Sequence, residues 1–260
     1  MRATLLLLSS LLGLSLAGVG QVSPTLTTTT LLSGHLDQAP SGDTVRLWVG
    51  AHRLKAPVSP TGDFQLVVTG LTRAGFVDFS VDRQRAPLYL TPGDQLRLTL
   101  DYPHFDESLR FTGRGATANN YLTQARWQFE EGPALRPQDR WTTTTTPAQA
   151  QAGADAFRTQ QLAFLTAYNQ QYPLPAEVQQ AATARITLLW ARLLLRYPAT
   201  HLRLAQTAPS LPDDYYAFLR KLPATTFIAT VERTPDDNTL ATRSLQAYSY
   251  RPAPTGSLPT

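Results

Sequence analysis

The chain has 260 residues, a formal net charge of +4 and no cysteine. The absence of cysteine excludes disulfides, thiolate metal ligands and thiol catalysis. Basic residues form no run, and residues 21–115 carry equal numbers of basic and acidic side chains. We therefore expect no nucleic-acid partner, because such a partner requires a clustered basic surface.

The N-terminus has the pattern of an export signal. Arg2 precedes an apolar run over residues 5–16, and small residues follow it. We predict a signal peptide over residues 1–20. The apolar run is shorter than the roughly 20 residues of a membrane-spanning helix, so we expect a periplasmic or secreted protein with no membrane span after signal cleavage.

Residues 21–115 predict an antiparallel β-sandwich domain. Short runs of alternating apolar residues recur there, each bounded by glycine, proline or aspartate. About seven strands are expected, at residues 31–32, 44–49, 64–69, 76–81, 87–90, 96–100 and 109–111. No segment with a helical period separates these runs, which favours antiparallel pairing over a doubly wound sheet.

The stretch Pro87–Leu100 predicts a half-buried β-hairpin. Proline presets the backbone for the first central turn position and glycine accepts a positive φ at the second, so Pro92-Gly93 favours a type II turn. The alternation of leucines on both sides of this turn leads us to expect that the two flanking strands pair with each other.

From Ala116 onward the period becomes helical, which predicts an α-helical domain over residues 116–250 and an α+β fold. Helices are expected at residues 116–131, from 147 to 172, from 175 to 197, at 213–221 and, more weakly, at 236–248. Thr146 is a suitable N-cap and Pro147 suits a first helical turn. Ile186–Leu195 is apolar nearly all round and predicts a buried helix. Residues 251–260 predict a disordered tail.

No catalytic, cofactor or metal site is predicted. The histidines lie at positions 35, 52, 104 and 201. They lack the close spacing of metal ligands. The adjacent acidic pairs at 106–107, 213–214 and 236–237 fit a loop and two helix starts better than acid/base catalysis. Gly113-x-Gly115 lacks the other residues of a nucleotide-binding loop. A hydrolase of unknown type stays open as a hypothesis.

The tryptophans raise a second hypothesis, a glycan-binding module. Exposed tryptophans on a sandwich can stack on sugar rings through their apolar faces. Trp48 lies at a strand end and Trp190 in an apolar helix, so we expect both to serve in packing. Trp127 and Trp141 remain as the speculative ligand surface.

Two stretches of the chain carry a family resemblance, YLTPGDQLRLTLD and FDESLRFTGRGATANNYL. The matching positions are Pro92, Gly93, Asp94, Phe111, Gly113, Gly115, Asn119, Asn120 and Tyr121. The stretches resemble the N-terminal region of periplasmic TlpA-like thiol:disulfide interchange proteins. In those proteins a β-sandwich and helices precede a thioredoxin-fold domain. The resemblance extends from about Ser33 to Tyr250 and implies the fold and the compartment.

The resemblance does not extend to the activity of the family. Its redox chemistry belongs to a Cys-x-x-Cys in the thioredoxin domain, and this chain has no cysteine. Our leading hypothesis is therefore a non-catalytic exported accessory module that binds a partner protein or associates with itself. A truncated member of the family is the other form of this hypothesis.

Overall fold

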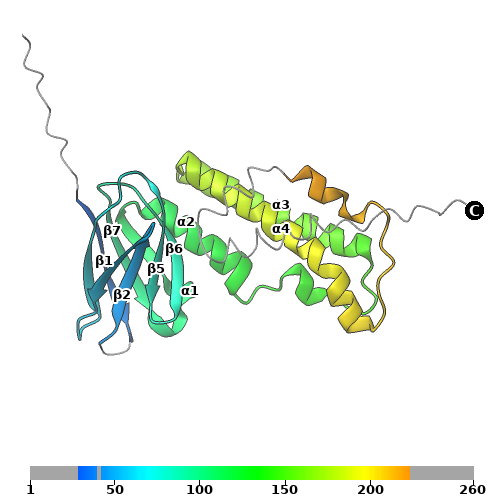
Figure 1. Ribbon diagram of the computed structural model, residues 1–260, viewed down its shortest axis with the longest axis horizontal. Coiled ribbons are helices and arrows are strands. Elements are labelled where there is room, and N and C mark those ends of the chain that lie inside the picture. Colours follow the sequence, from blue (N-terminus) through cyan, green and yellow to red (C-terminus); the bar gives the residue numbers. More distant parts are fainter. Residues whose placement is uncertain (1–28, 40–41, 223–260) are drawn as a thin grey trace, which may run out of the picture.

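The computed structural model describes residues 29–39 and 42–222, which form eight strands followed by helices (Figure 1). The strands are β1 (Thr30–Asp37), β2 (Thr44–Val49), β3 (His52–Pro57), β4 (Asp63–Val68), β5 (Gly75–Val81), β6 (Gln84–Leu90), β7 (Gln95–Asp101) and β8 (Arg110–Arg114). One sheet has the order β4-β1-β7-β8 and the other β3-β2-β5-β6. The predicted α+β fold, a sandwich followed by helices, is confirmed.

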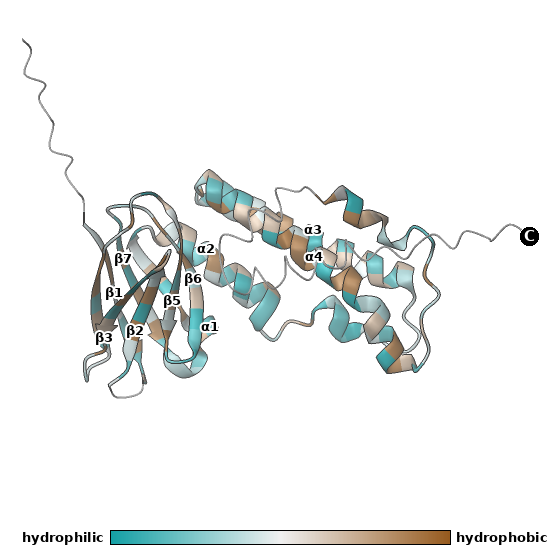
Figure 2. Ribbon diagram, viewed as in Figure 1, coloured by the Kyte–Doolittle hydropathy of each residue, from teal (hydrophilic) through white to brown (hydrophobic). Residues whose placement is uncertain are grey.

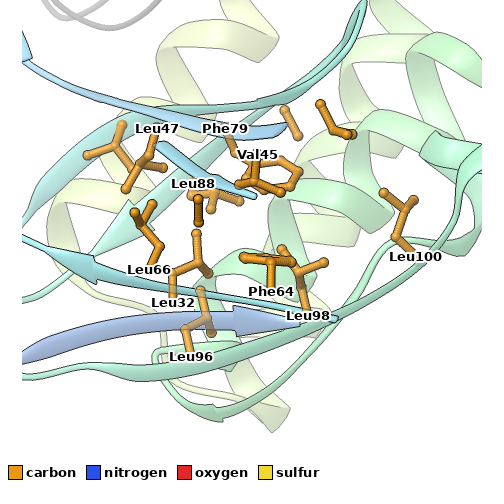
Figure 3. Packing of buried hydrophobic residues seen from close by; sticks show 14 of the residues in the cluster. Leu32, Val45, Leu47, Phe64, Leu66, Phe79, Leu88, Leu96, Leu98 and Leu100 are labelled. Carbon is orange, nitrogen blue, oxygen red and sulfur yellow. The ribbon is translucent and has the colours of Figure 1, made fainter. Parts of the chain in front are cut away.

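The alternation of apolar residues produces the core between the two sheets. On β2, Val45, Leu47 and Val49 are buried while the residues between them lie on the outer face. Figure 3 shows core side chains from both sheets meeting, among them Leu32, Val45, Leu47, Phe64, Leu66, Phe79, Leu88, Leu96, Leu98 and Leu100. Because each such side chain contributes about 1.5–3 kcal/mol when buried, this layer supplies much of the stability that cysteine-free folding requires.

Strand β3 is the element that the sequence pattern does not reveal. Arg53 and Lys55 are exposed, and among its residues only Ala56 is buried. The strand pairs antiparallel with β2 and lies at the edge of its sheet. The strand has polar or charged residues at His52, Arg53 and Lys55, so it lacks the apolar alternation by which the other strands are recognised.

The predicted hairpin over Pro87–Leu100 is wrong, although its turn is right. The Asp94 amide donates to the Thr91 carbonyl at 3.0 Å and Gly93 has φ +88°, as a type II turn requires. However, β6 pairs with β5, whereas β7 pairs with β1 and β8. The turn therefore crosses from one sheet to the other. Half-buried strands of both sheets show the same alternation, so the pattern could not distinguish these two pairings.

The pairing of β1 with β7 is a second departure from expectation. The two strands run parallel, whereas the other strand pairs of the described chain are antiparallel. β1 therefore lies between β4 and β7 as a central strand rather than at an edge.

The helices are α1 (Phe105–Ser108), α2 (Ala116–Arg126), α3 (Pro147–Gln171) and α4 (Ala176–Ala205), together with a π-helical turn η2 (Trp127–Glu131) and the 3₁₀ turns η1 (Tyr102–His104), η3 (Pro137–Arg140) and η4 (Tyr215–Lys221). Most of the helices follow the strands in chain order, but η1 and α1 lie between β7 and β8, so the acidic pair at 106–107 lies in a short helix and not in the predicted loop. The predicted cap of α3 is confirmed. The Thr146 hydroxyl accepts from the Gln149 amide at 3.2 Å, the Gln149 side chain accepts from the Thr146 amide at 2.9 Å, and Pro147 begins the helix.

Helix α4 is the central element of the helical part. Its middle buries Leu188, Ala191 and Leu194, as the apolar stretch predicts, and hydrophobic residues gather there in Figure 2. The helix continues through Pro198 to Ala205, beyond the expected end. None of the helices in the described part of the chain has the length and hydropathy needed to cross a bilayer.

Three predicted features lie outside the described residues. They are the signal peptide over residues 1–20, the weak helix at 236–248 and the tail at 251–260.

The glycine of strand β8 provides the first prediction. Gly113 has φ +85°, and a Cβ there would lie 2.2 Å from the Gln95 carbonyl oxygen. Gly50 has φ +58° and open space around it. We expect Gly50→Ala to lower the free energy of unfolding by about 1 kcal/mol and Gly113→Ala by about 3 kcal/mol or more, measured by urea denaturation. Equal losses in the free energy of unfolding of the two variants would show that β8 shifts to make room for the added methyl group.

Candidate functional site

Two adjacent asparagines near the start of α2 form hydrogen bonds with an edge strand of each sheet. The Asn119 side-chain oxygen accepts from the Tyr89 amide at 2.8 Å, and its NH₂ group donates to the carbonyls of Tyr89 and Gly115, both at 2.8 Å. Asn120 makes the same two bonds, each 2.9 Å long, to the amide and carbonyl of Phe111. Tyr89 and Phe111 lie on β6 and β8, which are edge strands. At that residue, each asparagine therefore supplies the two hydrogen bonds that a neighbouring strand would otherwise make.

The turn before β7 is tied to the same helix. Asp94 is buried, and its carboxylate accepts from the Thr91 amide at 2.8 Å. Gly115, at the N-cap of α2, has φ +97°, and a Cβ there would lie 2.6 Å from a carboxylate oxygen of Asp94. Gly93 donates to the Thr30 hydroxyl at 2.7 Å. The residues that carry the family resemblance thus surround the connection between the sandwich and the helices.

Tyr121 extends this connection into the helical part. Its ring is buried, lies 5.8 Å from Phe164 in a stacked arrangement and meets Tyr168 edge-on at 5.3 Å. Burial raises its pKa well above the usual value. The Tyr89 hydroxyl donates to Glu177 at the start of α4 at 3.0 Å. Packed rings therefore join α2 to α3, and a hydrogen bond joins β6 directly to α4.

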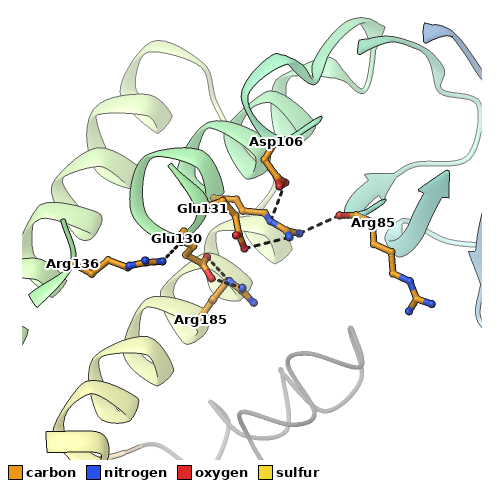
Figure 4. Close-up of polar contacts among 7 residues, drawn as sticks. Arg85, Asp106, Glu130, Glu131, Arg136 and Arg185 are labelled. Atoms are coloured by element: carbon orange, nitrogen blue, oxygen red, sulfur yellow. Dashed lines mark hydrogen bonds and ion pairs between the residues drawn. The ribbon is translucent and has the colours of Figure 1, made fainter. Parts of the chain in front are cut away.

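Arg126 at the end of α2 connects three neighbouring elements (Figure 4). Its guanidinium lies 3.3 Å from Asp106 and 3.4 Å from Glu131, and it donates to the Arg85 carbonyl at 3.3 Å. It therefore links α1, η2 and β6.

Glu130, within the π-helical turn, fastens that turn to α4. Arg185 donates to both of its carboxylate oxygens, at 2.9 and 2.6 Å, and Arg136 donates to its carbonyl. Figure 4 shows this pair between α4 and η2. A bidentate arginine–carboxylate pair fixes orientation as well as distance, so we interpret this cluster as structural.

A groove lies between α3, α4 and η4. Its volume is about 1070 Å³. Gln151, Gln180 and Thr183 line it from the two long helices, and Tyr215 and Phe218 line it from η4. We call it the α3–α4 groove.

Trp190 forms part of the wall of the α3–α4 groove and is fixed there on several sides. Its ring nitrogen donates to Asp155 at 2.7 Å, the guanidinium carbon of Arg158 lies 4.9 Å from its ring centre, and Phe218 meets it edge-on at 5.4 Å. The residue is 7% exposed. This wall therefore combines an apolar surface with a cation and a carboxylate. Sequence spacing could not reveal it, because Asp155 and Trp190 lie on different helices.

The histidines stay separate in the folded chain. His35 pairs with Asp63 at 3.0 Å and His104 with Asp101 at 2.7 Å, and the hydrogen bond that His104 donates to Asp101 raises the pKa of His104. His201 lies in the helical part, on α4. Within the described residues, no three acidic or histidine side chains form a group that could hold a metal ion.

The two tryptophans proposed as a ligand surface lie in different surroundings. Trp127 is half-buried, and its ring packs against Gly132. Trp141 is half-buried and meets Tyr197 edge-on at 5.5 Å, beside a smaller hollow of about 440 Å³. Among the described residues, no ring contact joins Trp127 to Trp141. Trp48 lies on the outer face of β2 and is also half-buried, so it is not a core residue.

Comparison with known proteins adds no relative to this picture: no family model matches the chain, and no curated protein matches it. The resemblance to TlpA-like proteins therefore stays a prediction.

The fully buried Asn119 generates the second prediction. Asn119→Ala leaves the amide and carbonyl of Tyr89 and the carbonyl of Gly115 without their partner. We expect a loss of about 2–4 kcal/mol in the free energy of unfolding. Asn169→Ala removes a side chain that accepts one bond, from the Leu174 amide, and should cost about 1 kcal/mol. Similar losses in both variants, by urea denaturation, would contradict the role of Asn119.

The buried carboxyl of Asp94 gives a prediction with a definite sign. Burial raises the pKa of Asp94 above 3.8, against the opposing hydrogen bond from Thr91. The folded state therefore binds this proton more tightly, and the stabilisation is fully present below pH 3.8 and lost as the pH rises through the folded pKa. We expect wild type to gain stability relative to Asp94→Asn when the pH falls from 7 to 3.5.

Asp63 provides the control of opposite sign. Hydrogen bonds from His35 and Thr61 lower its pKa, so its stabilisation is present above the ordinary pKa and lost as the pH falls. Wild type should lose stability relative to Asp63→Asn over the same range. If the stability of wild type relative to each variant changed in the same direction with pH for both aspartates, the opposite pKa shifts assigned to them would be contradicted.

Proposed function

We propose that this chain is an exported accessory module that binds a segment of a partner protein and performs no catalytic step itself. The proposal includes a relationship to the N-terminal part of TlpA-like thiol:disulfide interchange proteins. The α3–α4 groove is the main support for the proposed binding of a partner segment. The lack of cysteine supports a role without thiol exchange, and the residues of the resemblance support the fold through Asn119, Asn120 and Gly115.

The length of the groove favours a peptide over a compact small molecule. On α3 its lining runs from Pro147 to Arg158, and on α4 from Gln179 to Trp190. Eleven helical steps span about 16 Å. About five residues of extended chain cover the same distance.

The chemistry of the lining also suits a peptide. Gln151 and Gln180 offer amide groups that donate and accept, which matches the alternating donors and acceptors of a peptide backbone. Trp190 and Phe218 form a buried apolar base. The exposed Ala148 and Pro212 supply accessible apolar surface for side chains.

The two other hypotheses from the sequence have less support from the geometry. Glycan binding at Trp127 and Trp141 would need both rings on one surface. Among the described residues no ring contact joins them, and Trp141 packs against Tyr197. A hydrolase of unknown type would need converging polar groups. In the α3–α4 groove the carboxylate of Asp155 already accepts from Trp190.

The test of the proposal uses two matched threonines. Thr183 lines the α3–α4 groove, is exposed and donates to the Gln179 carbonyl at 2.8 Å. Thr166, on α3, is also exposed and donates to the Leu162 carbonyl at 2.9 Å. Peptides selected from a random library on the full wild-type chain should bind Thr183→Arg about tenfold more weakly, a difference of about 1.4 kcal/mol. Thr166→Arg should leave their affinity unchanged.

Two results would overturn the proposal. One is a library that yields no peptide with measurable affinity, or peptides that bind both arginine variants equally well. The other is turnover of any substrate class by the purified chain.

A further inference from the structure

Basic residues gather on the outer face of the β3-β2-β5-β6 sheet, although they are scattered in the sequence. In one row across the strands, Arg46 of β2 lies opposite Lys55 of β3 and opposite Ser80 of β5, and Ser80 lies opposite Arg85 of β6. In the next row, Trp48 lies opposite Arg53 and Asp78. Four cations therefore share one face.

The burial pattern shows that these side chains face away from the core. On β2 the core residues are Val45, Leu47 and Val49, so the intervening Arg46 and Trp48 lie on the outer face. Arg53, Lys55 and Arg85 are exposed. Neighbouring strands are about 4.8 Å apart, and alternate residues of a strand about 6.6 Å apart, so the cations lie within reach of one ligand chain.

Trp48 lies among these cations. The guanidinium carbon of Arg85 is 5.9 Å from its ring centre, a cation–π contact. Asp78 is the acidic residue of these two rows. In the described part of the chain, no ion pair joins Arg46, Arg53, Lys55 or Arg85 to a carboxylate.

We propose that this basic face, defined by Arg46, Trp48, Arg53, Lys55 and Arg85, binds an acidic polysaccharide. Its regularly spaced carboxylates would pair with the cations, and a sugar ring would stack on Trp48. This inference is independent of the α3–α4 groove.

Two other classes of polyanion fit the basic face less well. Single-stranded nucleic acid is held by successive bases stacked on several aromatic rings, and the rows described above present one. An acidic peptide could pair with the cations, but it has no sugar ring to stack on Trp48.

The experiment measures binding of the full chain to polygalacturonate by affinity electrophoresis and by tryptophan fluorescence, with dextran as the neutral polymer. We expect retardation by polygalacturonate alone, weakened by added salt because exposed charges are screened. Arg53→Gln/Lys55→Gln should lower the affinity about tenfold or more. The fluorescence change on binding should disappear in Trp48→Phe.

The control variant removes the same charge from the other sheet. Arg97 and Arg110 are exposed residues of β7 and β8, and Arg97→Gln/Arg110→Gln should retain the wild-type affinity. Circular dichroism checks that all variants fold.

Any of three results would overturn the proposal. These are the absence of binding at low salt, equal losses in both double variants, and tighter binding of oligothymidylate or polyglutamate than of polygalacturonate.

Discussion

The hydrogen bonds from Asn119 and Asn120 to two edge strands are the constraint on which the arrangement of this protein depends. An edge strand presents unpaired amides and carbonyls that must find partners. At β6 and β8 these partners are the side-chain amides of Asn119 and Asn120. Each amide accepts one hydrogen bond from its edge strand and donates one to it. Both side-chain amides belong to α2. This one helix therefore covers the edge strands of both sheets on the same side of the sandwich.

The position of the helical part follows from this attachment. With α2 fixed, Tyr121 contacts Phe164 and Tyr168 of α3, and Glu130 is in place to receive Arg185 of α4. These contacts set the two long helices side by side, which creates the groove beneath η4. The two proposed binding surfaces lie on different parts of the molecule: the groove on the helices and the basic face on a sheet.

The sequence predicts the local structure well and the long-range pairing poorly. Alternation identifies the strands around Val45 and Leu98, and Thr146-Pro147 locates the start of α3, because these signals lie within a few residues of each other. Strand pairing and the α3–α4 groove join residues far apart in the chain, such as Asp155 and Trp190. A search for basic runs likewise misses a face formed by strand register. The predicted signal peptide and the family relationship stay predictions.

Amide hydrogen exchange at Tyr89 and Phe111 tests the central claim most directly. We expect slow exchange at both positions, with protection approaching that of global unfolding, because buried or half-buried side-chain amides bind these edge-strand groups. In Asn119→Ala, protection at Tyr89 should fall far more than protection at Phe111. Exchange in the wild-type chain as fast as that of exposed turns would contradict the claim that α2 closes the two sheets.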